Sequence, residues 1–462
     1  MRLNLQYLLP LALVGLAGCK MGPDYARPVV EPPATFRGST EAEPTHLPGW
    51  KSVFGDEQLN ALIEEALENN YDVRTAAARI LEAQAQYRIE RSGMYPTIEV
   101  GGDITNTEIS RGALNLPPEV PIKREQTVGQ ATLQASYEID FWGRLRRLSE
   151  AGRAEYLSTE WAARQVRVDL IGAVSRAYFD LMEIERELEI ATRTFETRQE
   201  SLRLTQARKD RGVATALEVR QAENLIYSAS TQIPRLERLH TQQENLLSFL
   251  LGRNPGEVSV EQRLGAQPPS VPEGLPSQLV ERRPDVVQAE QTLIAANARI
   301  GAAKAALFPT FSLTGALGFG SRELDQFLDG DSRQRTLTAG VLAPIFNAGR
   351  LRARVRVTEA QQQQMLIAYE RAIRDALREV SDALVAVQKT REQSEQQARL
   401  VEALREANRL SNLRYEGGVD AYLQVLDSER DLFQGELALA QVRRDEWSAV
   451  VNLYQALGGG WE

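Results

Sequence analysis

The sequence predicts a mainly α-helical protein with a transmembrane β part, in which two tandem repeats each combine a long helical hairpin with paired strands. Three observations predict this fold class: motifs that recur in the same order, short regions with a period of two, and long regions with a helical period. The chain has 462 residues, of which 43% are hydrophobic and 25% charged, a globular composition and not a disordered one.

The repeat consists of five short matches that follow one another in the same order. The clearest is Gly-Arg-Leu-Arg, which stands at 143–146 and again at 349–352. The offset is 213 residues up to the Pro-Thr motifs at Pro96 and Pro309, and 206 residues after them. One length change of seven residues accounts for the difference, so we expect each half to be one structural unit.

Each repeat is expected to open with a helix, since Leu59, Leu62, Ile63 and Ala66 follow a helical period. This helix is predicted to run over about 56–91, and its counterpart over about 277–304. The predicted organisation is a signal peptide (1–18), an extended N-terminal segment (19–55), a first repeat (56–255), a linker (256–276) and a second repeat (277–462).

Alternation of apolar and polar residues predicts strands over 97–105, 127–140 and 311–319. In the second of these, Ala131, Leu133 and Tyr137 share one face, and Gln130 and Thr132 the other. One polar face is typical of half-buried antiparallel strands. With a partner for the third segment, one chain supplies four candidate strands.

A helical period follows the strands in both repeats and continues for roughly 65 residues, from about Leu145 to Lys209 in the first. Leu181, Leu188 and Phe195 keep a seven-residue spacing, which favours coiled-coil packing. Each long helix meets a Gly-Val turn and is expected to return through about 35 further helical residues.

The N-terminus has the form of a secretory signal, with a positive Arg2 and a short apolar stretch from Leu8 to Gly18. The stretch is shorter than the roughly 20 apolar residues that a membrane span needs. Leu-Ala-Gly-Cys at 16–19 resembles a bacterial lipobox, so Cys19 is predicted to become the first mature residue and to carry lipid. The alternative is a plain signal peptide. Lys20, where inner-membrane retention prefers Asp, favours sorting to the outer membrane.

Composition excludes several other classes of protein. The net charge of −9 provides no basic field for nucleic acid. A single Cys and only two His, His46 and His240, leave little material for a metal site or a catalytic triad, so no metal or cofactor beyond the lipid is expected. Both His are predicted to lie at the surface, and Trp50, Trp142 and Trp461 to serve in packing.

Four strands cannot close a barrel, for which about eight are needed. An open sheet in lipid would leave its edges unpaired. We therefore expect a homo-oligomer, in which three copies would supply twelve strands around a water-filled lumen, extended by a ring of long helices. A lipid-anchored protein with this architecture would act as a conduit.

At this point the residues resemble those of the TolC-type outer-membrane efflux proteins, in their OprM-like lipoprotein branch. The resemblance covers essentially the whole mature chain. It rests on these segments, which are specific only in combination: Gly22–Pro28, Trp50 with Phe54–Asp56, Ile139–Arg144, Glu281–Asp285, Pro344–Arg350, Tyr415–Asp420 and Leu457–Trp461.

The resemblance implies a trimer with a twelve-stranded barrel in the outer membrane and an α-helical barrel in the periplasm. It also implies docking onto a periplasmic adaptor protein and an inner-membrane pump, and the efflux of drugs or other small molecules. No enzyme activity is expected.

The family also implies where the tunnel is narrowest, namely at the periplasmic ends of the hairpins, here near 208–216 and 414–422. Asp420, Gln424, Asp427 and Asp431 follow the spacing of one helical face. In a trimer, a lumen-facing Asp would form a ring that attracts cations and raises the carboxylate pKa by mutual repulsion. The alternative is an ordinary solvated face.

Other residues at these ends match positions near the family's gate. Arg414 and Tyr415 match the gate itself, and Glu218 an acidic partner position in the first hairpin. Some family members have Arg where this chain has Asp420, so the closing contacts are expected to differ here. Asp210 and Arg211 are further candidates, for which tip solubility is the alternative.

Two other interpretations stay open at this stage. An adaptor or structural lipoprotein would also carry long hairpins, although one hairpin with small β-domains would suffice for it. A lipid-anchored enzyme would need a clustered acid, base and binding loop, and the sequence offers no such set. A trimer that requires detergent and changes its mobility on heating would fit only the conduit.

Overall fold

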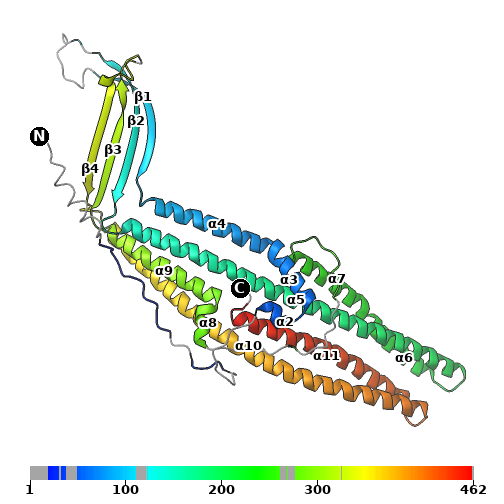
Figure 1. The fold of residues 1–462 in the computed structure, drawn as a ribbon. Helices are drawn as coiled ribbons and strands as arrows, with labels where there is room; N and C mark the ends of the chain where they lie inside the picture. The colour runs from blue at the N-terminus through cyan, green and yellow to red at the C-terminus, as the bar shows by residue number, and fades with distance from the viewer. Residues whose placement is uncertain are drawn as a thin grey trace. The chain divides into compact units, whose positions relative to one another are not determined.

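The computed structural model is mainly helical with one four-stranded sheet, which confirms the predicted fold class (Figure 1). It describes residues 19–30, 33–37, 49–110, 121, 123–260, 268, 276–323 and 325–459. The predicted signal peptide, His46, Trp461 and most of the linker lie outside the described residues.

The elements follow one another twice in the same order, as helices, two strands, one long helix and a helical return. Their bounds are α2 (Trp50–Phe54), α3 (Glu57–Asn69), α4 (Tyr71–Ser92), β1 (Thr97–Glu108), β2 (Glu125–Ile139), α5 (Arg144–Asp210), α6 (Ala216–Ser230), α7 (Gln232–Leu250), α8 (Pro276–Arg282), α9 (Pro284–Ala305), β3 (Thr310–Ser321), η3 (Gly330–Ser332), β4 (Arg333–Leu342), α10 (Arg350–Glu416) and α11 (Tyr422–Ala456).

The opening helix is interrupted at the equivalent place in both repeats, so the prediction of single helices was wrong. Asn70 separates α3 from α4, and its side chain accepts the N–H of Asp72 at 2.8 Å, which caps the new helix. In the second repeat Arg283 separates α8 from α9. Pro284 follows it, and proline has no N–H and fits a helix only in its first turn.

The four strands form one antiparallel sheet in the order β1-β2-β3-β4, and the three bounded strand predictions fall on β1, β2 and β3 (Figure 1). The register is continuous across the sheet: Ala131 of β2 pairs with Phe319 of β3, which pairs with Arg333 of β4. Because paired residues share a face, the alternation within each strand gives the sheet one apolar and one polar face.

The long helices α5 and α10 have 67 residues each, close to the predicted length. The second return, α11, is one helix of 35 residues as predicted. The first return is divided at Thr231 into α6 and α7, which the prediction missed. Pro234 explains the division, because its ring would clash with the carbonyl of Ser230 in a continuous helix.

Two compact units divide the chain, and each takes residues from both predicted repeats. One contains the sheet, in 81–158 and 290–368 together with the N-terminal residues to Pro28. The other contains 29–80, 159–289 and 369–462. The two sequence repeats therefore do not correspond to the two compact units. The predicted boundaries of the repeats stay a prediction.

Each unit has its own core. Small side chains meet in the sheet-containing unit, where Ala151 and Ala154 of α5 pack against Ala295 and Ala298 of α9. The core of the other unit joins α2, α3, α5, α7 and α11 through larger residues, including Leu59, Ile63, Tyr178, Leu181, Leu247 and Val451. Among the described helices, none has a stretch that is both long and apolar enough to cross a membrane.

Candidate functional site at the hairpin ends

Both long hairpins end in the same hydrogen-bonded turn. After α5, the N–H of Val213 donates to the carbonyl of Arg208 at 2.9 Å, and the N–H of Gly212 to that of Lys209 at 2.8 Å. The same two bonds recur 206 residues later, after α10. Gly212 and its equivalent Gly418 have φ values of 75° and 72°, which glycine adopts without the steric cost of a Cβ.

Arg414 and Asp420 form a bidentate ion pair across the second turn. The Arg414 Nε and Nη2 atoms lie 2.6 and 2.9 Å from the two carboxylate oxygens of Asp420. These hydrogen bonds, together with the charge of Arg414, lower the pKa of Asp420. The expected rise in this pKa concerns repulsion between three copies in a trimer, so it stays a prediction.

Tyr415 joins the two hairpin ends. Its ring lies 5.0 Å from the ring of Tyr422, at the start of α11, between ring centroids. The guanidinium of Arg208, at the end of α5, lies 4.6 Å from the centroid of Tyr415. Burial is the main cause that raises the pKa of Tyr415, so its hydroxyl stays neutral. The cation–π contact thus joins the two hairpin ends, and the ring contact joins the two helices of the second hairpin.

Glu218 has a capping role at the first end. Its carboxylate accepts the N–H of Thr215 at 2.5 Å, and its own N–H donates to the Thr215 hydroxyl at 3.2 Å. This reciprocal arrangement is a capping box, which satisfies N–H groups at the start of α6. The spacing Thr-x-x-Glu was visible in the sequence as a helix-start signal, and the sequence analysis missed it.

The remaining predicted tip residues are distributed around the start of α11. Asp420 precedes this helix, so it does not lie on the helical face that Gln424, Asp427 and Asp431 share. Asp427 pairs with Arg430 at 3.1 Å, and Asp431 pairs with the same Arg430 at 3.2 Å. Gln424 is exposed in the first turn of α11, and Asp210 is exposed at the end of α5.

Behind the hairpin ends, a groove of about 720 Å³ runs between α5, α10 and α11. Its floor contains Arg198, which is almost fully buried and stacks over Phe433 with 5.1 Å to the ring centroid. Burial lowers the pKa of Arg198 and raises that of Glu429, whose carboxylate lies 4.0 Å from the Arg198 Nε. Nothing in the sequence indicates that this arginine is buried, because its neighbours in the chain are polar.

The sheet has an apolar face that is largely exposed in the described part of the chain. Val100, Ile104 and Leu337 on this face expose 82%, 81% and 78% of their surface. The predicted alternation and antiparallel pairing are confirmed. The expected half-burial holds for many residues of the central strands β2 and β3, but it is wrong for the edge strands β1 and β4, which are exposed in the single chain. The opposite face carries glycines and polar side chains, including Gln130, Thr132, Gln134, Ser136, Thr314, Thr336 and Thr338.

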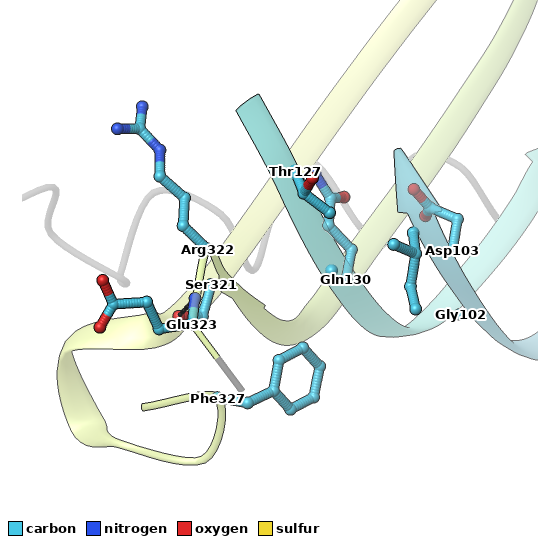
Figure 2. A pocket seen from close by; sticks show the side chains of 10 residues that line it. Gly102, Asp103, Thr127, Gln130, Ser321, Arg322, Glu323 and Phe327 are labelled. Carbon is cyan, nitrogen blue, oxygen red and sulfur yellow. Dashed lines mark hydrogen bonds between the residues drawn. The ribbon is translucent and has the colours of Figure 1, made fainter. Parts of the chain in front are cut away.

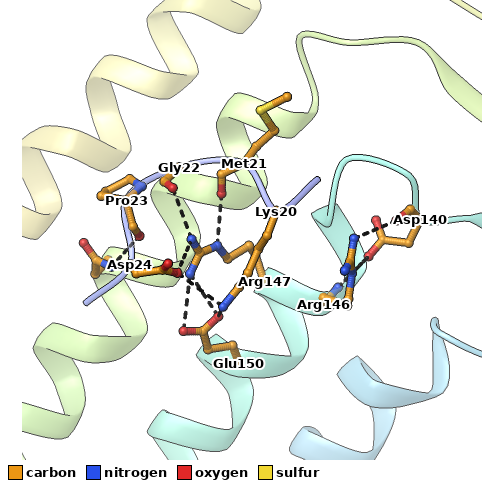
Figure 3. A network of polar contacts seen from close by, with 10 residues as sticks. Lys20, Met21, Gly22, Pro23, Asp24, Asp140, Arg146, Arg147 and Glu150 are labelled. Atoms are coloured by element: carbon orange, nitrogen blue, oxygen red, sulfur yellow. Dashed lines mark hydrogen bonds and ion pairs between the residues drawn. The ribbon is translucent and has the colours of Figure 1, made fainter. Parts of the chain in front are cut away.

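The residues that follow Cys19 are fixed to the sheet-containing unit by Arg147 (Figure 3). Arg147 is fully buried, and it donates to the carbonyls of Met21 and Gly22 at 3.0 and 3.2 Å and to the carboxylate of Asp24 at 3.0 Å. Cys19 itself is exposed. An exposed cysteine at the start of an anchored segment is accessible to modification.

A close backbone contact supports the same segment. Gly22 has a left-handed φ of 85°, and a Cβ there would lie 2.5 Å from the Cα of Gly301 in α9. Further along, Glu290 accepts hydrogen bonds from Tyr25 at 3.0 Å and from the Arg27 Nε at 2.8 Å. The sequence analysis did not identify Arg147 or Gly301, because neither lies in a pattern that indicates burial.

The histidine and tryptophan predictions have mixed outcomes. His240 is partly buried, with its ring nitrogens 3.3 Å from carboxylate oxygens of Glu185 and Glu244, so the surface prediction was wrong. Within the described ranges, no three His, Cys, Asp or Glu side chains are grouped to hold a metal ion. Trp50 is buried, and Trp142 stacks on Phe308 at 4.6 Å between centroids, which confirms their packing role.

Comparison with protein families matches this chain to the model described as outer membrane efflux protein, over residues 62–253 and 275–459. The chain belongs to this family. The matched segments together cover most of both repeats. As a member of the family, the chain is an outer-membrane efflux protein, which confirms the resemblance inferred from its motifs.

Individual relatives are similar over nearly their full length. The chain is 36% identical to the cation efflux system protein CusC of Escherichia coli, covering 98% of this chain and 99% of CusC. It is also 36% identical to the probable efflux pump outer membrane protein TtgC of Pseudomonas putida, covering 98% and 96% of the two chains. The open state of the outer membrane channel MtrE of Neisseria gonorrhoeae superposes with a TM-score of 0.86 at 32% identity, covering 96% of this chain and 99% of MtrE.

Proposed function

We propose that this efflux protein is the outer-membrane channel of a tripartite system, which passively conducts drugs or other small molecules from an inner-membrane pump and a periplasmic adaptor to the outside. The observation that carries the proposal is the two-faced sheet. One face is apolar and exposed, as a lipid-facing surface must be, and the other is polar, as the wall of an aqueous lumen must be.

The open edges of the sheet support a homotrimer. β1 and β4 each have a neighbour on one side only. In hydrocarbon, unpaired backbone groups cost several kcal/mol each, so β4 of one copy must pair with β1 of the next until the sheet closes. Three copies provide twelve strands, enough for a water-filled barrel, and the long hairpins would then form a helical tunnel in the periplasm.

The hairpin ends are the proposed gate of this tunnel. The contact between Tyr415 and Arg208 holds the second end against the first, and the pair Arg414–Asp420 closes the turn of the second end. Asp420, Gln424 and Asp427 are the proposed lumen-facing residues, and three copies of each carboxylate would select for cations. Glu218 contributes by fixing the start of α6, and Asp210 is a charged residue at the tip.

The proposed anchor is a covalent lipid on Cys19. Its support is the lipobox sequence together with the exposure of Cys19 beside a segment fixed by Arg147. Several acyl chains on one cysteine would give a durable attachment, because each buried CH₂ contributes about 0.8 kcal/mol. The anchor and the sheet would hold the protein in the same membrane.

Planar-bilayer recording of the purified full-length chain tests the proposed function. We expect conductance steps of uniform size, together with a detergent-solubilised oligomer whose gel mobility changes on heating. Protein that needs no detergent, stays monomeric and produces no conductance would overturn the proposal in favour of an adaptor or structural lipoprotein.

A further inference from the structure

Two arginines lie on the apolar face of the sheet, near its loop end. Arg333 pairs with Phe319 and Arg335 with Leu317, and both partners belong to the apolar face. Since cross-strand partners share a face, both guanidinium groups leave the sheet on that side. Both residues are exposed, and within the described part of the chain neither guanidinium group forms a hydrogen bond or an ion pair.

A charge on a lipid-facing strand is costly unless it reaches the polar edge of the bilayer. For Arg the cost is largest at the midplane and becomes small near the interface. Arg333 is the first residue of β4 after the β3–β4 loop, and Arg335 is two residues further along. Their side chains are long enough to extend from this position to the headgroup layer.

The end of the sheet that holds these arginines is the one opposite to the helices. β2 leads into α5, and β4 is followed by α10, whereas the other ends of these strands meet the loops between β1 and β2 and between β3 and β4. With the helices in the periplasm, as the proposed function requires, the arginines lie at the outer leaflet.

The apolar face beside the arginines is hollowed. Along the row of Arg333 and Phe319, the next positions are Ala131 and Gly102, whose side chains are small or absent. A pocket of about 680 Å³ begins there, lined by Gly102, Ile104 and the ring of Phe327 among others.

Phe327 comes from the β3–β4 loop, and its ring lies beside the strands while Arg322 points away from it (Figure 2). A Cβ on Gly129 would lie 3.6 Å from the ring of Phe327, so glycine there leaves the ring room to pack on the sheet. Small residues and one aromatic ring thus form a shallow apolar depression next to two cationic groups.

We propose that this surface binds a phosphate-bearing lipid of the outer leaflet. Arg333 and Arg335 would hold its phosphate groups, and an acyl chain would lie over Gly102 and Ala131 against Phe327. Guanidinium groups suit this role, because their planar fork binds phosphate oxygens in pairs and is only weakly hydrated. The inference rests on the proposed function, since it assumes that the apolar face is in the bilayer.

Native mass spectrometry of the full-length protein, released from detergent after incubation with defined lipids, tests this inference. The probes are bis-phosphorylated lipid A, its dephosphorylated form, and inorganic phosphate. We expect the wild type to retain the phosphorylated lipid, the dephosphorylated form at least about tenfold less, and free phosphate not at all. The double variant Arg333→Gln/Arg335→Gln should lose retention to the same degree.

Arg124→Gln is the matched control, because it removes one exposed arginine at the same end of the sheet that already pairs with Glu108 at 2.7 Å. It should retain the lipid as the wild type does. If the double glutamine variant does not assemble, Arg333→Lys/Arg335→Lys keeps the charges but not the paired geometry, and we expect it to retain less lipid than the wild type.

Equal retention of both lipid forms by the wild type, or full retention by an assembled double variant, would overturn the lipid site. Conductance recorded on the same preparations separates this outcome from failure of the proposed function. A wild type that conducts but does not discriminate between the lipids contradicts only the lipid site, whereas a wild type that does not conduct contradicts the channel.

Discussion

The guanidinium of Arg208 lies over the ring of Tyr415, 4.6 Å from its centroid, and so connects the end of the first long helix with the end of the second. Arg208 and Arg414 are equivalent in the two repeats, 206 residues apart, yet they have different partners. Arg414 pairs with Asp420 within its own hairpin, and only Arg208 contacts the other hairpin. The difference arises because the position equivalent to Asp420 in the first repeat is Ala214.

Removing the ring of Tyr415 should loosen the proposed gate. We expect Tyr415→Ala to increase the open-to-closed ratio of single channels roughly two- to fivefold, since an exposed cation–π contact contributes about 0.5–1 kcal/mol. Tyr415→Phe is the control, because it keeps the ring and should behave as the wild type does. An unchanged open probability in the alanine variant would exclude this contact from the gate.

Asp420 should control the passage of cations. Because Arg414 lowers the pKa of Asp420, the carboxylate is charged throughout the neutral pH range, where its effect on conductance should be constant. Asp420→Ala should change single-channel conductance and weaken block by divalent cations. Glu392→Ala removes an exposed carboxylate of α10 that lies away from the hairpin end and serves as the comparison; equal effects of both would mean that Asp420 does not line the lumen.

The two hairpin ends differ in how their return helices are capped, which allows a reciprocal test. Thr215→Ala removes a capping side chain and should destabilise the first end by about 1 kcal/mol. Ala421 has the equivalent position and no side-chain cap, so Ala421→Thr should form a capping box with Gln424. Hydrogen exchange at the tip amides should be faster in the first variant and slower in the second. The same change in both would contradict this account of the caps.

A buried carboxylate on α5 should make stability depend on pH. Burial, aided by the charge of Glu187, raises the pKa of Glu183 from 4.5 to about 7. The folded state therefore binds more protons between these values, so the free energy of unfolding falls as pH rises from 4.5 to 7. The loss is expected to be about 1–3 kcal/mol, reduced by solvent screening.

Glu183→Gln should remove that loss, so its Tm should change less than the wild-type Tm between pH 5 and pH 8. Glu189→Gln is the control, because Glu189 pairs with Arg186 at the surface and should leave the pH dependence as it is. A wild-type Tm that rises between these pH values would contradict the raised pKa of Glu183.

The N-terminal segment should come free when its contact with α9 is blocked. In Gly22→Ala, the new methyl group would lie 2.5 Å from the Cα of Gly301, and φ is 85°, so the segment cannot keep its place. We expect proteases to cleave residues 20–27 faster than in the wild type. Gly55→Ala is a suitable comparison, since Gly55 also has a positive φ but open space around it. If residues 20–27 of this variant are cleaved at the wild-type rate, the faster cleavage in Gly22→Ala is due to the clash with Gly301.

Much of the fold could be predicted because period and order are local properties of the chain. The alternation in β2 and the helical period of α5 and α10 placed these elements closely. The breaks at Asn70 and Thr231 were missed, because a capping side chain and a single proline act over a few residues within otherwise helical patterns. Of these, the proline at 234 was the recoverable signal.

The candidate site was predicted less well, because its contacts depend on which side chains meet in space. Arg414, Tyr415 and Asp420 were identified, but the ion pair between Arg414 and Asp420, which lowers the pKa of Asp420 within one chain, was not. Glu218 was identified for a gate role, and the structure shows it as a capping residue. Arg147 was not identified at all, because a single buried arginine does not change the hydrophobic periodicity from which burial is predicted.

The central claim is that copies of this chain share one closed sheet, and the mass of the detergent-solubilised particle tests it most directly. Light scattering that separates protein from detergent should give a protein mass three times the 51.5 kDa of the full-length chain, or slightly less after removal of the signal peptide. A single protein mass near that of one chain, in protein that retains its strands and helices, would contradict the shared sheet.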